Sequence, residues 1–137
     1  MESLKINKVQ IRNLQIEDYT QLSQSFKRVY SDGSDVFWTH KQIEKLIKIF
    51  PEGQIVTVVD EKIEGCALSI ILDYDKVKND HTYAQVTGKE TFDTHNPDGN
   101  ILYGIEVFIH PDYRGLRLAR RMYEYRKELC ETLNLKA

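Results

Sequence analysis

Eight consecutive residues, 114–121, contain four arginines and no acidic side chain: Arg114, Arg117, Arg120 and Arg121. They stand at the start of a predicted helix, and glutamates follow only toward its other end. The N-terminal end of a helix already carries about half a positive charge, so carboxylates normally stabilise it and cations do not. Cations at this end indicate a site in which a bound anion satisfies both the guanidinium groups and the helix terminus.

The segment before these arginines supports an anion site. ILYGIEVFIH, residues 101–110, is nearly all apolar or β-branched, which predicts a central strand. Gly115 in the following turn lets the backbone approach a ligand, and the first N–H groups of a helix have no partner within it. Each hydrogen bond from Arg114 or Arg117 to a phosphate would contribute roughly 1.5–3 kcal/mol, against about 0.3–1 kcal/mol for a cation at the helix start. This balance favours a phosphorylated ligand over the alternative, a surface helix whose arginines lie in water or pair with its glutamates.

Apolar periodicity and turn residues predict the other elements. The order is a strand (8–14), a helix (16–30), a helix capped by Thr39 and Gln42, two strands joined near 60–62, a strand (101–110) and a helix (116–133). A long polar connection covers residues 73–100, and NLKA at 134–137 is typical of the start of a further strand. Hairpins with one strand–helix crossover predict an α/β (α+β) fold of order β-α-α-β-β-β-α, with a mixed, mostly antiparallel sheet flanked by helices.

The segment VFIHPDYRGLRLARRMYEYRKEL resembles the acetyl-CoA-binding core of the GNAT superfamily of N-acyltransferases. In that family a strand leads into a loop of pattern Q/R-x-x-G-x-G/A, which opens a helix. The corresponding loop here consists of Arg114, Gly115, Leu116, Arg117, Leu118 and Ala119. Arg117 stands where the family usually has glycine, and its side chain can itself meet a phosphate. The element order also fits, so the resemblance covers nearly the whole chain. More narrowly, the chain resembles GNAT domains that precede a carbon–nitrogen hydrolase domain.

The resemblance implies a GNAT-like fold and an acyl-CoA-dependent N-acyltransferase, which transfers an acetyl group from acetyl-CoA to a primary amine by direct attack. In this family the strand before the helix holds the pantetheine arm through exposed backbone groups, which corresponds to Val107, Phe108 and Ile109. A strand edge offers the N–H and C=O groups that the pantetheine amides require. The loop 114–119 would hold the pyrophosphate, and Arg120 either contacts a phosphate or stays in water.

Glu106 is the candidate catalytic base. Acetyl transfer needs a neutral amine, and many members of the family carry a glutamate on this strand. Strand alternation would direct its side chain opposite Ile105 and Val107, and burial would raise its pKa, which suits a base. One alternative is a structural glutamate paired with a nearby arginine. Another is His110 as the base, although ahead of Pro111 it is expected mainly to shape the turn.

The acceptor amine is expected near the first two helices and the long connection. Trp38 lies between the helices and is expected chiefly as a packing anchor. The connection contributes candidate side chains of the acceptor site: His81, Tyr83, Thr91 and His95. The histidines of the chain lack the spacing of metal ligands, so no metal is predicted.

Composition excludes several classes of protein. A length of 137 residues suits one domain, and a net charge of −2 argues against a nucleic-acid binder. No apolar run approaches the roughly 20 residues that span a membrane, and the N-terminus lacks the apolar block of a signal peptide. Cys66 and Cys130 are far apart, with no CxxC spacing, and are expected to be buried, reduced thiols of a cytoplasmic protein.

The chain ends where the family fold would continue with another strand. Residues 1–137 are therefore interpreted as a single GNAT-like acyl-CoA-binding domain, either the N-terminal portion of a longer chain or a module that pairs with a second copy as a homodimer. Two further functions stay open. One is a catalytically silent CoA-binding module that regulates a fused hydrolase. The other is a helix that uses its arginines to bind an acidic protein or RNA, which the acidic remainder of the chain disfavours.

Overall fold

The computed structural model describes residues 8–30, 37–77, 91–110 and 117–136. Its elements are, in chain order, β1 (Val9–Asn13), the 3-10 helix η1 (Ile16–Asp18), α1 (Tyr19–Val29), α2 (His40–Ile49), the 3-10 helix η2 (Pro51–Gly53), β2 (Ile55–Val59), β3 (Lys62–Leu72), α3 (Tyr74–Val77), β4 (Ile101–Ile109) and α5 (Leu118–Leu133). The predicted order of strands and long helices is confirmed.

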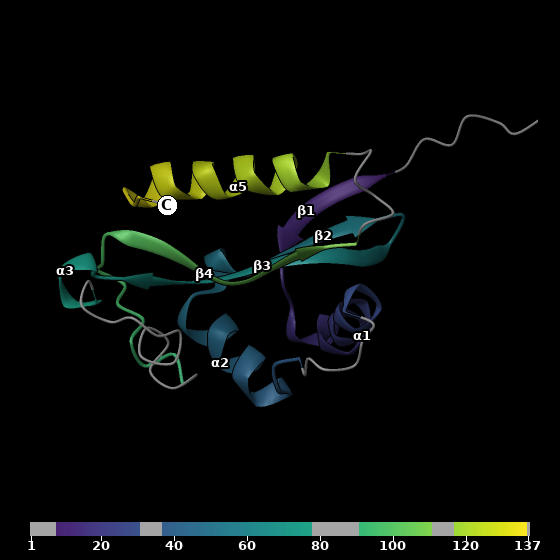
Figure 1. The fold of residues 1–137 in the computed structure, drawn as a ribbon, viewed down its shortest axis with the longest axis horizontal. Helices are drawn as coiled ribbons and strands as arrows, with labels where there is room; N and C mark the ends of the chain where they lie inside the picture. Colours follow the sequence, from purple (N-terminus) through teal and green to yellow (C-terminus); the bar gives the residue numbers. More distant parts are fainter. Residues whose placement is uncertain (1–7, 31–36, 78–90, 111–116, 137) are drawn as a thin grey trace, which may run out of the picture.

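The four strands form one antiparallel sheet in the order β1-β2-β3-β4. The helices lie on both faces of this sheet, with α5 on one side and α1 and α2 on the other (Figure 1). The larger core lies on the side of α1 and α2 and includes Leu22, Phe26, Leu46, Leu68 and Phe108. Smaller clusters lie beneath α5 and join Met122 to Ile55 and Ala67, and Cys130 to Ile71 and Leu102.

Local sequence signals explain where the helices and the hairpin begin. The hydroxyl of Thr39 accepts a hydrogen bond from the Gln42 amide, and the Gln42 side chain accepts one from the Thr39 amide, which is the predicted capping box. The turn between β2 and β3 places Asp60 and Glu61 in the left-handed region, with φ of 50° and 69°. Two consecutive left-handed residues match the right-handed twist of a tight hairpin.

The strand β4 is the last of the four strands in this sheet and lies beside β3. On its outer side the described residues provide a single parallel bridge, between Ile101 and Lys136. The Leu102 amide donates to the Lys136 carbonyl at 2.8 Å, and the Lys136 amide donates to the Asn100 carbonyl at 2.9 Å. The bridge confirms that the last residues begin another strand.

Cys66 and Cys130 are both free and buried, as predicted. They lie on opposite faces of the sheet, since Cys66 belongs to the core beneath α1 and α2 and Cys130 to a cluster beneath α5.

Candidate functional site

The strand β4 carries a bulge at its centre. Leu68 of β3 pairs with Glu106, whereas the next residue, Ser69, pairs with Gly104, so Ile105 is an extra residue in β4. A bulge of this kind breaks the alternation of side chains between the two faces. Ile105 is buried in the core beneath α1 and α2, and the Glu106 carboxylate also lies on that side, where it contacts Trp38. The expectation that Glu106 points opposite Ile105 is therefore wrong at this position.

Trp38 holds the Glu106 carboxylate. Its indole Nε1–H donates to Glu106 Oε1 at 3.4 Å, while its backbone carbonyl accepts a 2.7 Å hydrogen bond from the hydroxyl of Tyr19. The indole also packs against Phe92, with the ring centroids 5.3 Å apart. Trp38 is thus the packing anchor that the sequence predicted, and in addition a hydrogen-bond donor to the candidate base. No sequence signal could have linked two residues separated by 68 positions.

The buried thiol of Cys66 lies close to Glu106. Burial raises the pKa of Cys66 well above its usual value, and the Glu106 charge raises it further, against a smaller opposing effect of a hydrogen bond with the Phe108 backbone. A neutral, fully buried thiol does not act as a nucleophile, because the thiolate is the reactive form. Cys66 is therefore not the nucleophile or base on this face of β4, and Glu106 stays the candidate base.

The three residues predicted to hold pantetheine differ in where their backbone groups point. The His110 amide donates to the Glu64 carbonyl of β3 at 2.7 Å, so the backbone groups of His110 face β3. Because direction alternates along a strand, those of Phe108 also face β3, and those of Val107 and Ile109 face outward. Phe108 instead fills the core with its ring, at 4% exposure, while the Val107 side chain is 48% exposed.

The N-cap residue of α5 provides no side-chain cap for the first amides of the helix. Arg117 is the N-cap residue, adopts a left-handed backbone with φ 55° and ψ 39°, and supplies no side-chain hydrogen bond to the cap. The first hydrogen bond of the helix is donated by the Arg121 amide to the Arg117 carbonyl, at 3.0 Å. The preceding amides of Leu118, Ala119 and Arg120 have no partner within the helix. Amides without a partner inside the helix favour an anion at the helix start.

Three of the arginines that the sequence singled out surround a shallow groove at this helix start. Arg117, Arg120 and Arg121 are exposed and line a groove of about 170 Å³ together with Glu124. Arg120 lies 3.5 Å from Glu124, a surface ion pair that contributes little. Neither Arg117 nor Arg121 forms an ion pair with a carboxylate of the described residues. Of the predicted pyrophosphate loop, Leu118 is buried and Ala119 is exposed, while Arg114, Gly115 and Leu116 lie outside the described residues.

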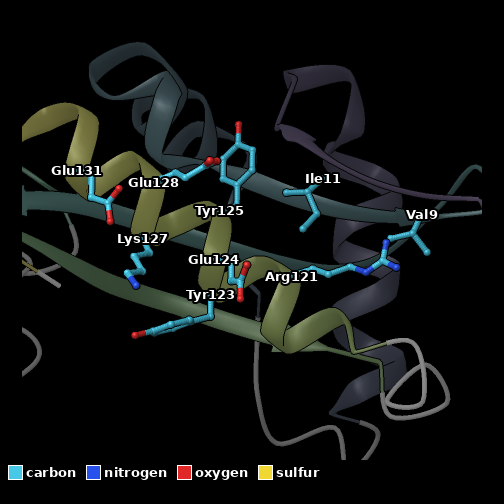
Figure 2. A pocket seen from close by; sticks show the side chains of 9 residues that line it. All are labelled: Val9, Ile11, Arg121, Tyr123, Glu124, Tyr125, Lys127, Glu128 and Glu131. Atoms are coloured by element: carbon cyan, nitrogen blue, oxygen red, sulfur yellow. The ribbon is translucent and has the colours of Figure 1, made fainter.

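A larger groove of about 660 Å³ runs between β1 and α5. Figure 2 shows its lining, with Val9 and Ile11 contributed by β1 and the remaining side chains by α5. Three glutamates line it, Glu124, Glu128 and Glu131, against two cations. Like charges repel, so a polyphosphate is disfavoured in this groove. The start of α5 is the better anion site, although its groove is smaller.

The acceptor side of the molecule is less well predicted. A groove of about 700 Å³ is lined by α2 together with Thr91 and Phe92, and Phe92 is the ring that packs on Trp38. Thr91 is thus at a groove, as expected, but His95 is part of the scaffold. Its Nδ1 accepts from the Ile71 amide at 3.0 Å, and its ring stacks on Phe50. His81 and Tyr83 lie outside the described residues.

Two features bear on ligands and membranes. Within the described ranges, no cluster of three or more His, Cys, Asp or Glu side chains is placed to hold a metal ion. In the same part of the chain, every helix is too short or too polar to cross a membrane.

Comparison with proteins of known sequence gives two relatives, both much longer than this chain. No model of a known protein family matches. The chain is 33% identical over 130 residues to the probable hydrolase YhcX of Bacillus subtilis strain 168, a match that covers 95% of the chain and 25% of that protein. It is 32% identical over 94 residues to the uncharacterized N-acetyltransferase YkwB of the same bacterium, covering 66% of the chain and 42% of YkwB. The chain therefore spans less than half of either relative.

Solved structures show the fold. The loading GNATL domain of CurA from Lyngbya majuscula has a TM-score of 0.71 at 24% identity, over 90% of this chain and 58% of that one. The GNAT-like decarboxylase GphF, in complex with isobutyryl-CoA, has a TM-score of 0.69 at 16% identity, over 85% and 56%. Ard1 from Thermoplasma volcanium has a TM-score of 0.58 at 14% identity, over 93% and 66%. The chain has a GNAT-like fold, as the resemblance in its sequence predicted.

Proposed function

We propose that the chain is an acyl-CoA-dependent N-acyltransferase that transfers an acetyl group from acetyl-CoA to a primary amine by direct attack. The observation that carries this proposal is the outer edge of β4. Beyond the Ile101–Lys136 bridge this edge pairs with no other described strand, carries a bulge at Ile105–Glu106 and ends near the arginine-rich start of α5. The GNAT-like fold, the N-acetyltransferase relative and the acyl-CoA in the GphF complex support it.

Acyl-CoA would bind along β4. The amides of its pantetheine arm can pair with the outward backbone groups of Val107 and Ile109, as an added strand would. Its diphosphate would then reach the start of α5, where the first helical amides and the Arg117 guanidinium offer donors. In this arrangement the thioester lies toward the bulge, and Glu106 is on the opposite face of the sheet from α5.

Glu106 would act as the base for the acceptor. An ammonium group must lose a proton before its nitrogen can attack, and the carboxylate can accept that proton directly or through one water. The hydrogen bond from the Trp38 indole orients the Glu106 carboxylate on this face of the sheet. The amine nitrogen then bonds to the thioester carbonyl carbon, outward N–H groups near the bulge stabilise the oxyanion, and the C–S bond breaks to release CoA, which takes up a proton as its thiol.

The test is release of free thiol from acetyl-CoA with a panel of primary amines. Turnover should fall by roughly 100-fold or more in Glu106→Gln, since general bases contribute about 10²–10⁴-fold. Trp38→Phe keeps the packing and removes the N–H, so it should lower kcat at pH 7 and move the acidic limb of the pH profile to higher pH, with little change in the KM for acetyl-CoA. Full turnover in Glu106→Gln would rule out its role as base.

A second candidate function is a catalytically silent CoA-binding module that regulates a fused hydrolase. The observation in its favour is the match to a probable hydrolase, of which this chain spans only 25%. This second function predicts that CoA binds and changes the rate of the hydrolase. It also predicts that neither this chain nor the longer protein releases free thiol from acetyl-CoA with any amine. Turnover therefore separates the two candidates.

We also propose that residues 1–137 form a single acyl-CoA-binding domain at the N-terminal side of a longer cytoplasmic protein. Both relatives are more than twice as long as the segment that they share with this chain, which supports a longer chain. We further propose that the domain forms a homodimer, which sedimentation of the purified chain tests.

A further inference from the structure

An arginine occupies the buried side of α5. The residues of this helix that face the sheet follow at intervals of four: Leu118, Met122, Arg126 and Cys130. The other three are buried, at 0%, 2% and 5% exposure. A spacing of four places side chains on one face of a helix, so Arg126 stands where an apolar residue is expected. A charged group at such a position needs a compensating partner.

The described residues supply only a small part of that compensation. Arg126 Nη2 donates to the hydroxyl of Ser69 at 3.3 Å, and Ser69 itself is 1% exposed. Arg126 Nε is buried without a hydrogen-bond partner. No carboxylate of the described residues forms an ion pair with it. Burial lowers the pKa of Arg126, partly offset by Cys130, yet a guanidinium stays charged in proteins. Apart from the buried Nε–H and the Nη2–H that binds Ser69, the guanidinium N–H groups have no partner among the described residues and can serve a ligand.

Gly104 makes room for this guanidinium at the edge of β4. A Cβ atom on Gly104 would lie 3.1 Å from Arg126 Nη2 and 3.6 Å from a methyl group of Val107. Gly104 and Val107 are both exposed, so the guanidinium can be reached from the open edge of the strand. The side chain thus lies across β4 on the α5 face, just beyond the bridge between Ile101 and Lys136.

This position coincides with the acyl end of the proposed ligand. The start of α5 would hold the diphosphate, and Arg126 lies about 12 Å further along the helix axis, at 1.5 Å per residue. An arm that follows β4 from Ile109 to Val107 runs in the same direction and ends near Gly104. The acceptor would approach from the opposite face, beside Trp38 and Glu106. A carboxylate near Arg126 would therefore belong to the acyl chain.

We propose that Arg126, with Ser69 beside it, selects acyl-CoA thioesters whose acyl chain ends in a carboxylate. This inference rests on the proposed binding of acyl-CoA along β4. It specifies the acyl group further: the site should prefer acyl chains with a terminal carboxylate over acetyl. The planar fork of a guanidinium matches a carboxylate with two parallel hydrogen bonds.

Calorimetric titration of the chain with four thioesters tests the inference: malonyl-CoA, glutaryl-CoA, acetyl-CoA and butyryl-CoA. The two carboxylated thioesters should bind roughly 10- to 100-fold more tightly than butyryl-CoA, the gain expected from a charged hydrogen-bonded pair. Arg126→Gln should abolish this difference and leave acetyl-CoA affinity within about threefold. Gly104→Ala, which keeps the arginine but crowds it, should reduce the difference.

Lys127→Gln is the matched control, because it removes one positive charge from the next residue of α5, which is exposed. It should leave the preference intact. If the unsubstituted chain binds coenzyme A but does not distinguish malonyl-CoA from butyryl-CoA, the inference is wrong and the proposed function stands. The inference is also wrong if Arg126→Gln weakens the binding of all four thioesters by the same factor. No binding of coenzyme A at all would overturn both proposals.

Discussion

Replacement of Arg117 by glycine should stabilise the fold and weaken the binding of coenzyme A. Arg117 has φ 55° and ψ 39°, a left-handed conformation. A residue with a Cβ atom lowers the free energy of unfolding by about 1–2 kcal/mol when it adopts this conformation. Glycine lowers it by about 0.5–1 kcal/mol, because glycine has more conformational freedom in the unfolded chain. Removal of a cation from the helix start contributes about 0.3–1 kcal/mol more. The free energy of unfolding should rise by about 1 kcal/mol, measured by urea denaturation.

The affinity for coenzyme A should change in the opposite direction. The Arg117 side chain is exposed and has no ion pair with the described residues, so it is available to a phosphate. Loss of one charge-assisted hydrogen bond, about 1.5–3 kcal/mol, should raise the Kd for coenzyme A roughly 10- to 100-fold in calorimetry. Arg117→Asn is the matched variant, since asparagine tolerates the left-handed backbone and also lacks the charge. The asparagine variant should show the same increase in the Kd for coenzyme A as the glycine variant.

Two results would contradict this account of Arg117. A glycine variant that binds coenzyme A as tightly as the parent chain would show that the guanidinium is not a phosphate ligand. A glycine variant that is less stable than the parent would show that the left-handed backbone is not the main cost at this position.

Two further predictions concern the scaffold of the site. Phe108→Ala should lower the free energy of unfolding by about 3–5 kcal/mol in urea denaturation, since the ring is 4% exposed and packs edge-on against Phe26 at 5.8 Å; a loss below about 1 kcal/mol would contradict this packing. Burial lowers the pKa of His95, so its contribution to stability is present above about pH 6.5, its usual pKa, and is lost as the pH falls through the lowered value. His95→Asn keeps an acceptor for the Ile71 amide and should reduce the drop in melting temperature between pH 7 and pH 5; an unchanged drop would exclude His95 as its source.

Much of the fold could be predicted because its signals are local. The capping pair Thr39 and Gln42, the alternation in β1 and the helical spacing in α5 each depend on residues within a few positions of one another. The neighbours of β4 could not be predicted in the same way, because they depend on pairing between residues far apart in the sequence.

The site was predicted in part, and the missing parts depend on long-range register. The bulge at Ile105 arises from the pairing of β4 with β3, and it turns Glu106 toward Trp38, a contact that sequence spacing does not encode. Arg126 is different, because its four-residue spacing from Met122 and Cys130 was present in the sequence. An arginine at an inward-facing position was the available signal.

The central claim is that the edge of β4 and the start of α5 together bind acyl-CoA. Titration of the ¹⁵N-labelled chain with coenzyme A, followed by amide chemical shifts, tests it most directly. Saturable shifts are predicted at Val107, Ile109 and the first amides of α5, with Val9 and Ile11 unaffected in the groove between β1 and α5. Shifts confined to that groove, or none at the β4 edge at millimolar ligand, would contradict the claim.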